Sequence, residues 1–379
     1  MMTEREIIYQ DRPKRGETET MEINLGPQHP STHGVLRIVV ELDGETVLKV
    51  VPHLGYLHRG IEKMAESRTY HQIIPLTDRL DYMAGISNNL GYCLAVEKLL
   101  GIETPPRGQY IRVILTELSR ISSHLFWAGA GAHDLGAMTP FFYMVREREQ
   151  ILYLLEMATG SRITPSFFRI GGVAMDLPPG FAEACMKLVK AFDARVDEYE
   201  TLLTENRIWK SRTQGVGYLS AGECIGMGVS GPMARAAGID WDLRKNQPYS
   251  GYDKFDFKDA VYHGCDAYDR YRVRMLELRQ SNEIIRQAVE GLPEGDHRVV
   301  LKGVIKPPPG EAYVAIEAPR GELGFYIVSD GTAQPWRMKI RSPTFVNLQS
   351  LAKMCEGKLF SDMIAALSSI DIVLAEVDR

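Results

Sequence analysis

The stretch FAEACMKLVKAFDARVDEYETLL, residues 181–203, carries the strongest signal for the fold of this 379-residue chain. Its apolar side chains recur every three or four residues, at Phe181, Cys185, Leu188, Phe192, Val196, Tyr199 and Leu202. This period places them on one face of a long helix whose opposite face is charged. Such a helix is stable when its apolar face packs against other elements, so the stretch predicts a partner layer.

Three further segments show the same helical period and lie on both sides of the first in the sequence: residues 110–127, 141–157 and 259–292. The second of them begins just after Thr139-Pro140, a pair that is typical of helix starts. Four amphipathic helices within residues 61–292 predict a helical bundle. The glycine-rich segment 214–246 has no period and is predicted to be a long loop.

Both ends of the chain show the two-residue period of strands instead. Residues 35–42 and 46–52 flank Asp43-Gly44, which favours a hairpin because both turn residues tolerate positive φ. After Pro293, four more strands and then two closing helices are predicted, at residues 298–305, 312–318, 323–329, 336–340, 345–353 and 362–369.

These patterns predict an α+β fold with a central helical bundle and small antiparallel β regions near the N-terminus and in the C-terminal part. The expected parts are a flexible N-terminal tail at 1–20, an N-terminal β region at 21–60, the helical bundle at 61–292, and C-terminal β-hairpins with closing helices at 293–379. The tail is polar and charged, which is typical of a loosely ordered terminus.

Composition narrows the class of protein. Hydrophobic residues make up 45% of the chain, enough for a sizeable core, and the net charge of −5 gives no nucleic-acid signature. The five cysteines form no C-x-x-C pair, so we expect no zinc site and no iron–sulfur cluster held by this chain alone. Unpaired thiols without a secretory leader favour a reducing, cytoplasmic compartment. Polar and charged residues interrupt the most apolar stretch, 84–100, so no membrane span is expected.

The candidate chemistry begins with the histidines, which are concentrated near the N-terminus. His29 and His33 stand four residues apart in GPQHPSTHG. This spacing suits a zinc pair, but the glutamate of H-E-x-x-H is missing, and Pro30 and Gly34 favour a loop. Taken alone, the stretch predicts a turn whose histidines cap backbone groups.

Three other residues have ordinary explanations when each is considered alone. Tyr82 predicts a core tyrosine whose hydroxyl is hydrogen-bonded. Asp134, between two predicted helices, predicts a helix-end residue, and Arg59 predicts a surface charge.

Five longer motifs change this interpretation: GPQHPSTHGVLR (26–37), GYLHRGIEK (55–63), DRLDY (78–82), HDLGAMTPFF (133–142) and EAPRGELGFY (317–326). In this order they closely resemble the D subunit of bacterial NADH-quinone oxidoreductase, the component of respiratory complex I that is related to nickel–iron hydrogenase large subunits. Five motifs in register are far more specific than one short motif. The resemblance extends from about residue 20 to the end of the chain.

The hydrogenase relationship also explains two unusual segments. Residues 79–84 and 371–376 resemble the metal-binding motifs R-x-C-G-x-C and D-P-C-x-x-C. The four thiolate positions hold Asp81, Ala84, Val373 and Glu376. Because a nickel–iron pair requires soft sulfur ligands, the resemblance implies a hydrogenase-like scaffold that binds no metal and no cofactor of its own.

The resemblance implies a role in quinone reduction. In the family, quinone binds between the D subunit and the smaller B subunit, which holds the terminal [4Fe–4S] cluster. Carried over by motif, His33 and Tyr82 are expected to bind the quinone head group, and Asp134 is expected to pair with His33. These three are the expected catalytic residues, and Arg59 is expected to lie near the cluster.

The same resemblance implies the partners and the location. The expected partners are the B, C and I subunits and the membrane arm, with quinone as the substrate and NADH oxidised elsewhere in the complex. The chain would be peripheral, on the cytoplasmic side of the cell inner membrane. It would be active only within the assembled NADH:quinone oxidoreductase, a proton-translocating enzyme.

The chemistry of quinones suits these residue types. A quinone has two carbonyl oxygens and takes up two electrons and two protons on reduction. A phenol and an imidazolium can donate hydrogen bonds to the carbonyls and then protons. Asp134 would raise the proton affinity of His33, and loss of that proton would leave Asp134 without a cationic partner, which we expect to start the coupling to proton pumping. One departure is Thr164, where many family members that use ubiquinone carry a histidine that can titrate.

Three alternatives fit parts of the sequence. A metal-free, hydrogenase-like structural subunit of a related membrane-bound oxidoreductase would not need His33, Tyr82 and Asp134 together. An active metal hydrogenase lacks its thiolates here, and only stoichiometric nickel in the purified protein would revive it. A His/Asp hydrolase has no activated serine or cysteine motif to support it.

Overall fold

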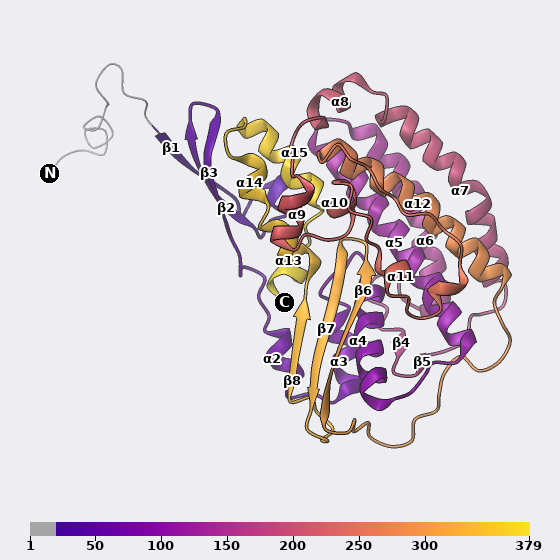
Figure 1. The fold of residues 1–379 in the computed structure, drawn as a ribbon. Coiled ribbons are helices and arrows are strands. Elements are labelled where there is room, and N and C mark those ends of the chain that lie inside the picture. The colour runs from indigo at the N-terminus through magenta and orange to yellow at the C-terminus, as the bar shows by residue number, and fades with distance from the viewer. Residues whose placement is uncertain (1–19) are drawn as a thin grey trace, which may run out of the picture.

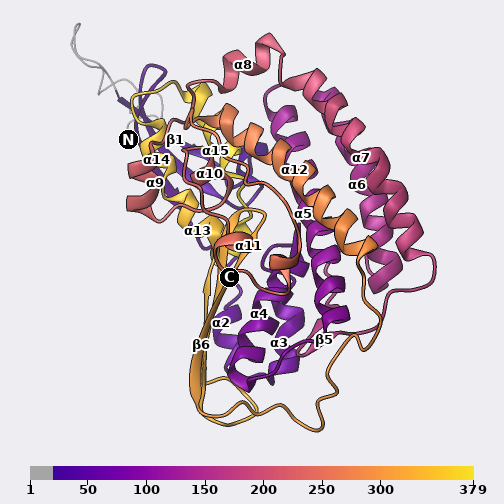
Figure 2. The ribbon, with the colours of Figure 1, turned by 45° about the vertical axis from the view of Figure 1, so that its right-hand side comes forward.

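Four long helices form the centre of the molecule (Figure 1), and the computed structural model describes residues 20–379. Their bounds are α5 Pro106–Asp134, α6 Met138–Thr159, α7 Phe181–Leu203 and α12 Ala267–Glu290. Helices α5 and α7 each pack against both α6 and α12 (Figure 2). The predicted bundle is confirmed, and α7 has the bounds of the periodic stretch that predicted it. The predicted tail at 1–20 lies outside the described residues except for Thr20.

Helix α5 is longer than the predicted segment 110–127 and carries a candidate site residue at its end. It begins with Pro106 in its first turn, which suits a helix start because proline lacks the N–H that would be unbonded there. Nearly every side chain from Ile111 to Leu125 is buried, including charged ones. Buried charges need partners inside the protein, so this helix must be surrounded by polar groups from other elements.

Two predictions in the second half of the chain are wrong. The helix predicted over 259–292 begins only at Ala267, where the Asp266 side chain accepts a hydrogen bond from the backbone N–H of Asp269 at 2.9 Å. The predicted loop at 214–246 contains the short helices α9 Ala221–Met227, α10 Pro232–Arg235 and α11 Leu243–Asn246. These helices are too short to show a period, and their sequence signal is a cap, such as the capping box of Ser220 and Glu223.

Two small antiparallel sheets lie at the ends of the chain, as predicted. The first, in the order β1-β2-β3, comprises Thr20–Leu25, Arg37–Asp43 and Thr46–His53, and the second, in the order β6-β7-β8, comprises Gly310–Ala318, Gly321–Ser329 and Arg337–Arg341. The second sheet packs on α4 (Gly85–Leu100) (Figures 1 and 2). The strand predicted at 298–305 is not formed, and only Arg298 makes a bridge, to Gly172. Gly303, with φ of +76°, and the prolines that follow explain the irregular backbone there.

The C-terminal helices pack on the first sheet and complete a second core. They are α13 Pro343–Leu348, α14 Leu351–Cys355, α15 Phe360–Ile370 and α16 Leu374–Asp378, so the helix predicted at 345–353 is divided in two. Their buried side chains join those of β1, β2 and β3, whereas β6, β7 and β8 belong to the core of the bundle. The remaining elements are short: η1 Pro30–Thr32, α2 Ile61–Ala65, α3 Tyr70–Thr77, β4 Phe168–Arg169, β5 Gly172–Val173, α8 Arg207–Thr213 and η2 Tyr252–Lys254.

Gly231 fixes a close approach between the start of α10 and the turn between β6 and β7. Its φ is +69°, and a Cβ at this position would lie 2.4 Å from the Gly321 Cα and 2.7 Å from the Arg320 carbonyl oxygen. We expect Gly231→Ala to lower the free energy of unfolding by about 2–4 kcal/mol because it combines backbone strain with a clash. Thermal unfolding measures this loss. Gly226→Ala is the matched control, because a Cβ there would meet nothing within 4 Å, and an equal loss in both variants would contradict the argument.

Candidate functional site

A buried arginine holds together three segments that are distant in the sequence. Arg320, in the turn between β6 and β7, donates from Nη1 to Asp81 Oδ2 at 2.6 Å and to Ser123 Oγ at 3.2 Å. Its Nη2 donates to Asp371 Oδ1 at 3.1 Å and its Nε donates to the Asp371 carbonyl oxygen at 3.0 Å. Burial alone would lower the pKa of Arg320, but Asp371 and Asp81 outweigh it and raise that pKa. The guanidinium is therefore a fixed positive charge at the base of the site.

Tyr82 sits on a turn that this arginine anchors. The Asp81 Oδ1 accepts hydrogen bonds from the backbone N–H groups of Met83 at 3.0 Å and Ala84 at 3.2 Å. The residues on both sides of Tyr82 are thus held by one carboxylate, while the Tyr82 side chain keeps 39% of its surface exposed. Burial raises the pKa of the Tyr82 phenol, and Arg320 opposes this rise. The phenol is a neutral hydrogen-bond donor at neutral pH.

His33 lies on a short capped turn. It ends η1 with φ of +53°, and its N–H donates to the Pro30 carbonyl oxygen. The Thr32 hydroxyl closes the turn on the carbonyl oxygens of Pro27, at 3.1 Å, and His29, at 2.9 Å. The expectation that a histidine caps this turn is correct for His29, whose Nδ1 accepts from the N–H that follows Pro30 at 3.2 Å. His33 instead remains accessible to solvent.

The charges around His33 come from three of these segments. Although its side chain is accessible, it lies in a concavity, and this burial lowers the pKa of His33, with Arg320 adding to the effect. Asp371 and Asp134 act in the opposite direction. Asp134 therefore acts on His33 in the predicted sense, but burial outweighs it, and the imidazole is neutral rather than protonated at neutral pH. Burial raises the pKa of Asp134, against the opposing effect of His33.

The expected pairing of Asp134 with His33 is electrostatic rather than direct. Within residues 20–379, no hydrogen bond or ion pair joins the two side chains. Asp134 is the last residue of α5, and its side chain is accessible to solvent. His33, Tyr82 and Asp134 thus come from three segments, surround the charges of Arg320 and Asp371, and face solvent in this chain.

Arg59 lies on a neighbouring part of the surface. Its Nη2 donates to the carbonyl oxygens of Arg79, at 2.9 Å, and Ala375, at 3.0 Å, while the side chain stays exposed. It therefore links the segment that leads to Tyr82 with α16. Burial and then Arg79 lower the pKa of Arg59. Thr164 is half-buried in the loop between α6 and β4.

Two of the four thiolate positions of the hydrogenase motifs face the same guanidinium. Asp81 binds Arg320 directly, and Glu376, on α16, lies near both of them. The five cysteines in the part of the chain that the structure describes are buried and unpaired, and no group of His, Cys, Asp or Glu there is arranged to hold a metal ion.

The prediction from sequence missed Arg320, Asp371 and Glu376 as members of the site. Arg320 lies in one of the five motifs, and the available signal was an arginine in a short turn between two apolar strands. Asp371 and Glu376 lie in the second hydrogenase-like segment. Nothing in the sequence shows that these groups meet a turn that lies more than 200 residues away, since Arg320 and Asp81 are 239 positions apart.

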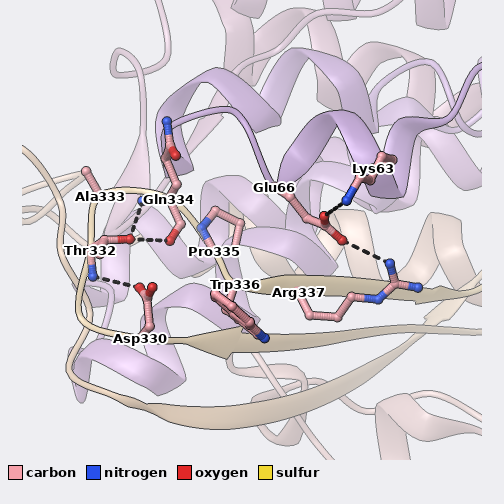
Figure 3. Close-up of a pocket in the computed structure, with 9 residues that line it drawn as sticks. All are labelled: Lys63, Glu66, Asp330, Thr332, Ala333, Gln334, Pro335, Trp336 and Arg337. Carbon is pink, nitrogen blue, oxygen red and sulfur yellow. Dashed lines mark hydrogen bonds and ion pairs between the residues drawn. The ribbon is translucent and has the colours of Figure 1, made fainter.

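The largest pocket on the chain lies elsewhere (Figure 3). It has a volume of about 810 Å³ and lies between α2 and the segment that joins β7 to β8. Its polar contacts are surface pairs, in which Glu66 accepts from Lys63 at 2.5 Å and from Arg337 at 3.0 Å. The predicted site residues do not line this pocket, so we base the site on the charges around Arg320.

The comparisons with known proteins identify the class of protein. Residues 134–379 match the family described as the 49 Kd subunit of the respiratory-chain NADH dehydrogenase, and the chain belongs to this family. Proteins named as the D subunit of NADH-quinone oxidoreductase are similar over nearly the whole chain. The protein of Geotalea uraniireducens is 52% identical over 96% of this chain and 99% of its own length. The D subunit of Solibacter usitatus that is numbered 2 is 57% identical over 94% and 96%, and the protein of Geobacter sulfurreducens is 51% identical over 96% and 99%.

Membrane-spanning helices are absent from residues 20–379. None of the helices in this range combines the length and apolar character that a bilayer crossing needs.

Proposed function

We propose that this chain binds the quinone head group in a proton-translocating NADH-quinone oxidoreductase, with His33, Tyr82 and Asp134 at the site of reduction. The observation that carries the proposal is the gathering of these three side chains around Arg320 and Asp371. A scaffold without a ligand has no need for a phenol, an imidazole and a carboxyl group that all face solvent beside a buried charge. The named function of the relatives supports the same role.

The residues suit quinone reduction, in which a quinone gains two electrons and two protons to become a quinol. The electrons would come from the terminal [4Fe–4S] cluster of the neighbouring B subunit. The Tyr82 hydroxyl and the N–H of the neutral His33 ring donate hydrogen bonds to the two carbonyl oxygens. Negative charge that develops on the quinone is stabilised by the nearby Arg320 guanidinium, in a site from which the head group displaces water.

Proton transfer from His33 and Tyr82 would complete the reduction. A reduced quinone raises the proton affinity of His33, because a nearby negative charge favours imidazolium. When His33 passes that proton on, Asp134 loses a cationic neighbour. We propose that this change in charge at the end of α5 starts the coupling to proton pumping.

Arg59 and its surroundings would form part of the contact with the B subunit. The exposed guanidinium would lie near the cluster and raise the local positive potential. Leu54 and Tyr56, which precede it, are 40% and 51% exposed, as expected of a surface that a partner covers. The C and I subunits and the membrane arm would contact other faces, and the chain would be peripheral on the cytoplasmic side of the inner membrane.

Photolabelling tests the proposed site in the assembled complex. A quinone that carries an azide on its head group should label the peptides 26–37 and 78–84 of this chain, and excess unlabelled quinone should prevent it. The peptide with Tyr153, which is 60% exposed on α6, is the internal control and should stay unlabelled. Label found wholly on other subunits, or label that excess quinone does not reduce, would contradict the proposal.

A further inference from the structure

The charges beneath the proposed quinone site do not balance. Three buried carboxyl groups, Asp81, Asp371 and Glu376, face two buried arginines, Arg320 and Arg274. If all of them were ionised, the group would carry one surplus negative charge away from water. Such a charge is costly in a protein interior, so the group favours one added proton.

Arg274 does not compensate the surplus through a direct ion pair. Its Nη1 donates to the carbonyl oxygens of Arg270 and Ser369, both at 3.2 Å, and its guanidinium lies over the Trp127 ring at 4.0 Å from the centroid. Asp371 is near enough to act on it electrostatically. Arg320, which holds Asp81 and Asp371, is therefore the direct partner for both carboxylates.

Glu376 is the carboxyl group without a cationic partner in contact. Its Oε2 accepts from the hydroxyl of Thr344 and from the Thr344 backbone N–H at 3.3 Å. Its Oε1 is fully buried and has no hydrogen-bond partner within residues 20–379. A proton on this oxygen would remove the desolvated charge.

We propose that Glu376 holds the exchangeable proton of this cluster and acts as a positioning residue for Tyr82, an inference that rests on the proposed quinone site. With Glu376 protonated, Arg320 is shared between Asp81 and Asp371 alone. With Glu376 ionised, a third carboxylate repels Asp81 and competes for Arg320. Because Asp81 holds the backbone on both sides of Tyr82, this change reaches the phenol.

The groups that face Glu376 come from every neighbouring element. Helix α13 contributes Thr344 and no ionisable side chain, the turn before α4 contributes Asp81, and the turn between β6 and β7 contributes Arg320. The remaining neighbours in α16 and its flanks have partners of their own: Asp371 binds Arg320, Asp378 accepts from the N–H groups of Gly55 and Leu57, and Arg379 donates to the Ile340 carbonyl oxygen. Burial, followed by Asp81, raises the pKa of Glu376 to about 7.

The pH profile of quinone reduction tests the proposal, because Glu376→Gln mimics the protonated state. At about pH 6, the assembled complex with Glu376→Gln should have a kcat/KM for quinone within about twofold of the wild type. At about pH 8, the wild type should have lost about tenfold and the variant should not, so the variant exceeds it. Glu356→Gln, which removes an exposed carboxyl group, should follow the wild type throughout. A ratio of variant to wild type that is constant with pH would overturn the proposal.

Infrared difference spectroscopy between the same two pH values gives a readout that does not depend on activity. The wild-type complex should lose a carbonyl stretch of a protonated carboxyl group as the pH rises, and Glu376→Gln should abolish that band. If Glu376→Gln does not assemble, Glu376→Asp should shift the midpoint of the band. A band that Glu376→Gln retains, or that Glu376→Asp leaves unmoved, would overturn the proposal. If the band behaves as expected but Tyr82→Phe leaves quinone turnover intact, the proton assignment stands and the quinone site fails.

Discussion

Replacing Tyr82 with phenylalanine should reduce quinone turnover by the assembled complex by about 10²–10⁴-fold, the usual contribution of a positioned proton donor. The substitution removes one hydroxyl and leaves the turn unchanged, because Asp81 holds the backbone around it and not the phenol. NADH oxidation with an artificial acceptor should keep its wild-type rate, since those electrons leave the complex before the quinone site. The measurement compares the two activities in the same preparation.

The control for this comparison is Tyr153→Phe. Tyr153 is 60% exposed on α6, away from the charges around Arg320, and its loss should change neither activity. An equal fall of both activities in Tyr82→Phe would mean that the variant damages the complex as a whole. Full quinone turnover in this variant would refute the assignment of Tyr82.

Replacing Arg320 with methionine should lower the free energy of unfolding by about 3–5 kcal/mol, because it leaves Asp81 and Asp371 buried without their cation. Both carboxylates are at most 6% exposed, so water cannot replace the guanidinium. We expect little or no assembled complex to contain this variant. The measurement is the amount of the chain in purified complex and the temperature at which the complex loses quinone turnover.

Arg279→Met separates burial from the loss of an ion pair. Arg279 also binds two carboxylates, Asp197 at 2.7 Å and Glu200 at 2.6 Å, but its side chain is 25% exposed and Asp197 is 70% exposed. This variant should cost no more than about 1 kcal/mol. Arg320→Lys should assemble better than Arg320→Met, because it keeps the charge, yet it should show reduced quinone turnover, because lysine cannot bind two carboxylates in the fork geometry. Equal losses in Arg279→Met and Arg320→Met would contradict the role of the buried cluster.

The sequence was sufficient for the elements that expose one face to water. Helix α7 was predicted with its observed bounds because its charged face lies opposite its buried face. Helix α4 was not predicted, since it is buried on nearly all sides and its polar residues, such as Asn89, lie in the core. The Asn89 amide donates to the Thr77 hydroxyl at 2.9 Å, a contact that no local pattern reveals. Complete burial thus removes the contrast from which a period is recognised.

The candidate site was only partly predictable for a different reason. His33, Tyr82 and Asp134 were found through motifs that resemble a family, and no property of each residue alone marked it. Arg320 and Glu376 belong to the site through contacts between the ends of the chain, and such contacts depend on the packing of the whole fold. The direction of the His33 pKa also required the structure, because burial and charge oppose each other there.

The most direct test of the central claim is an electron cryo-microscopy structure of the assembled complex with quinone bound. We predict that one carbonyl oxygen of the head group accepts a hydrogen bond from the Tyr82 hydroxyl and the other accepts one from the His33 ring, with Asp134 beside that ring. A head group bound out of reach of both side chains would contradict the account.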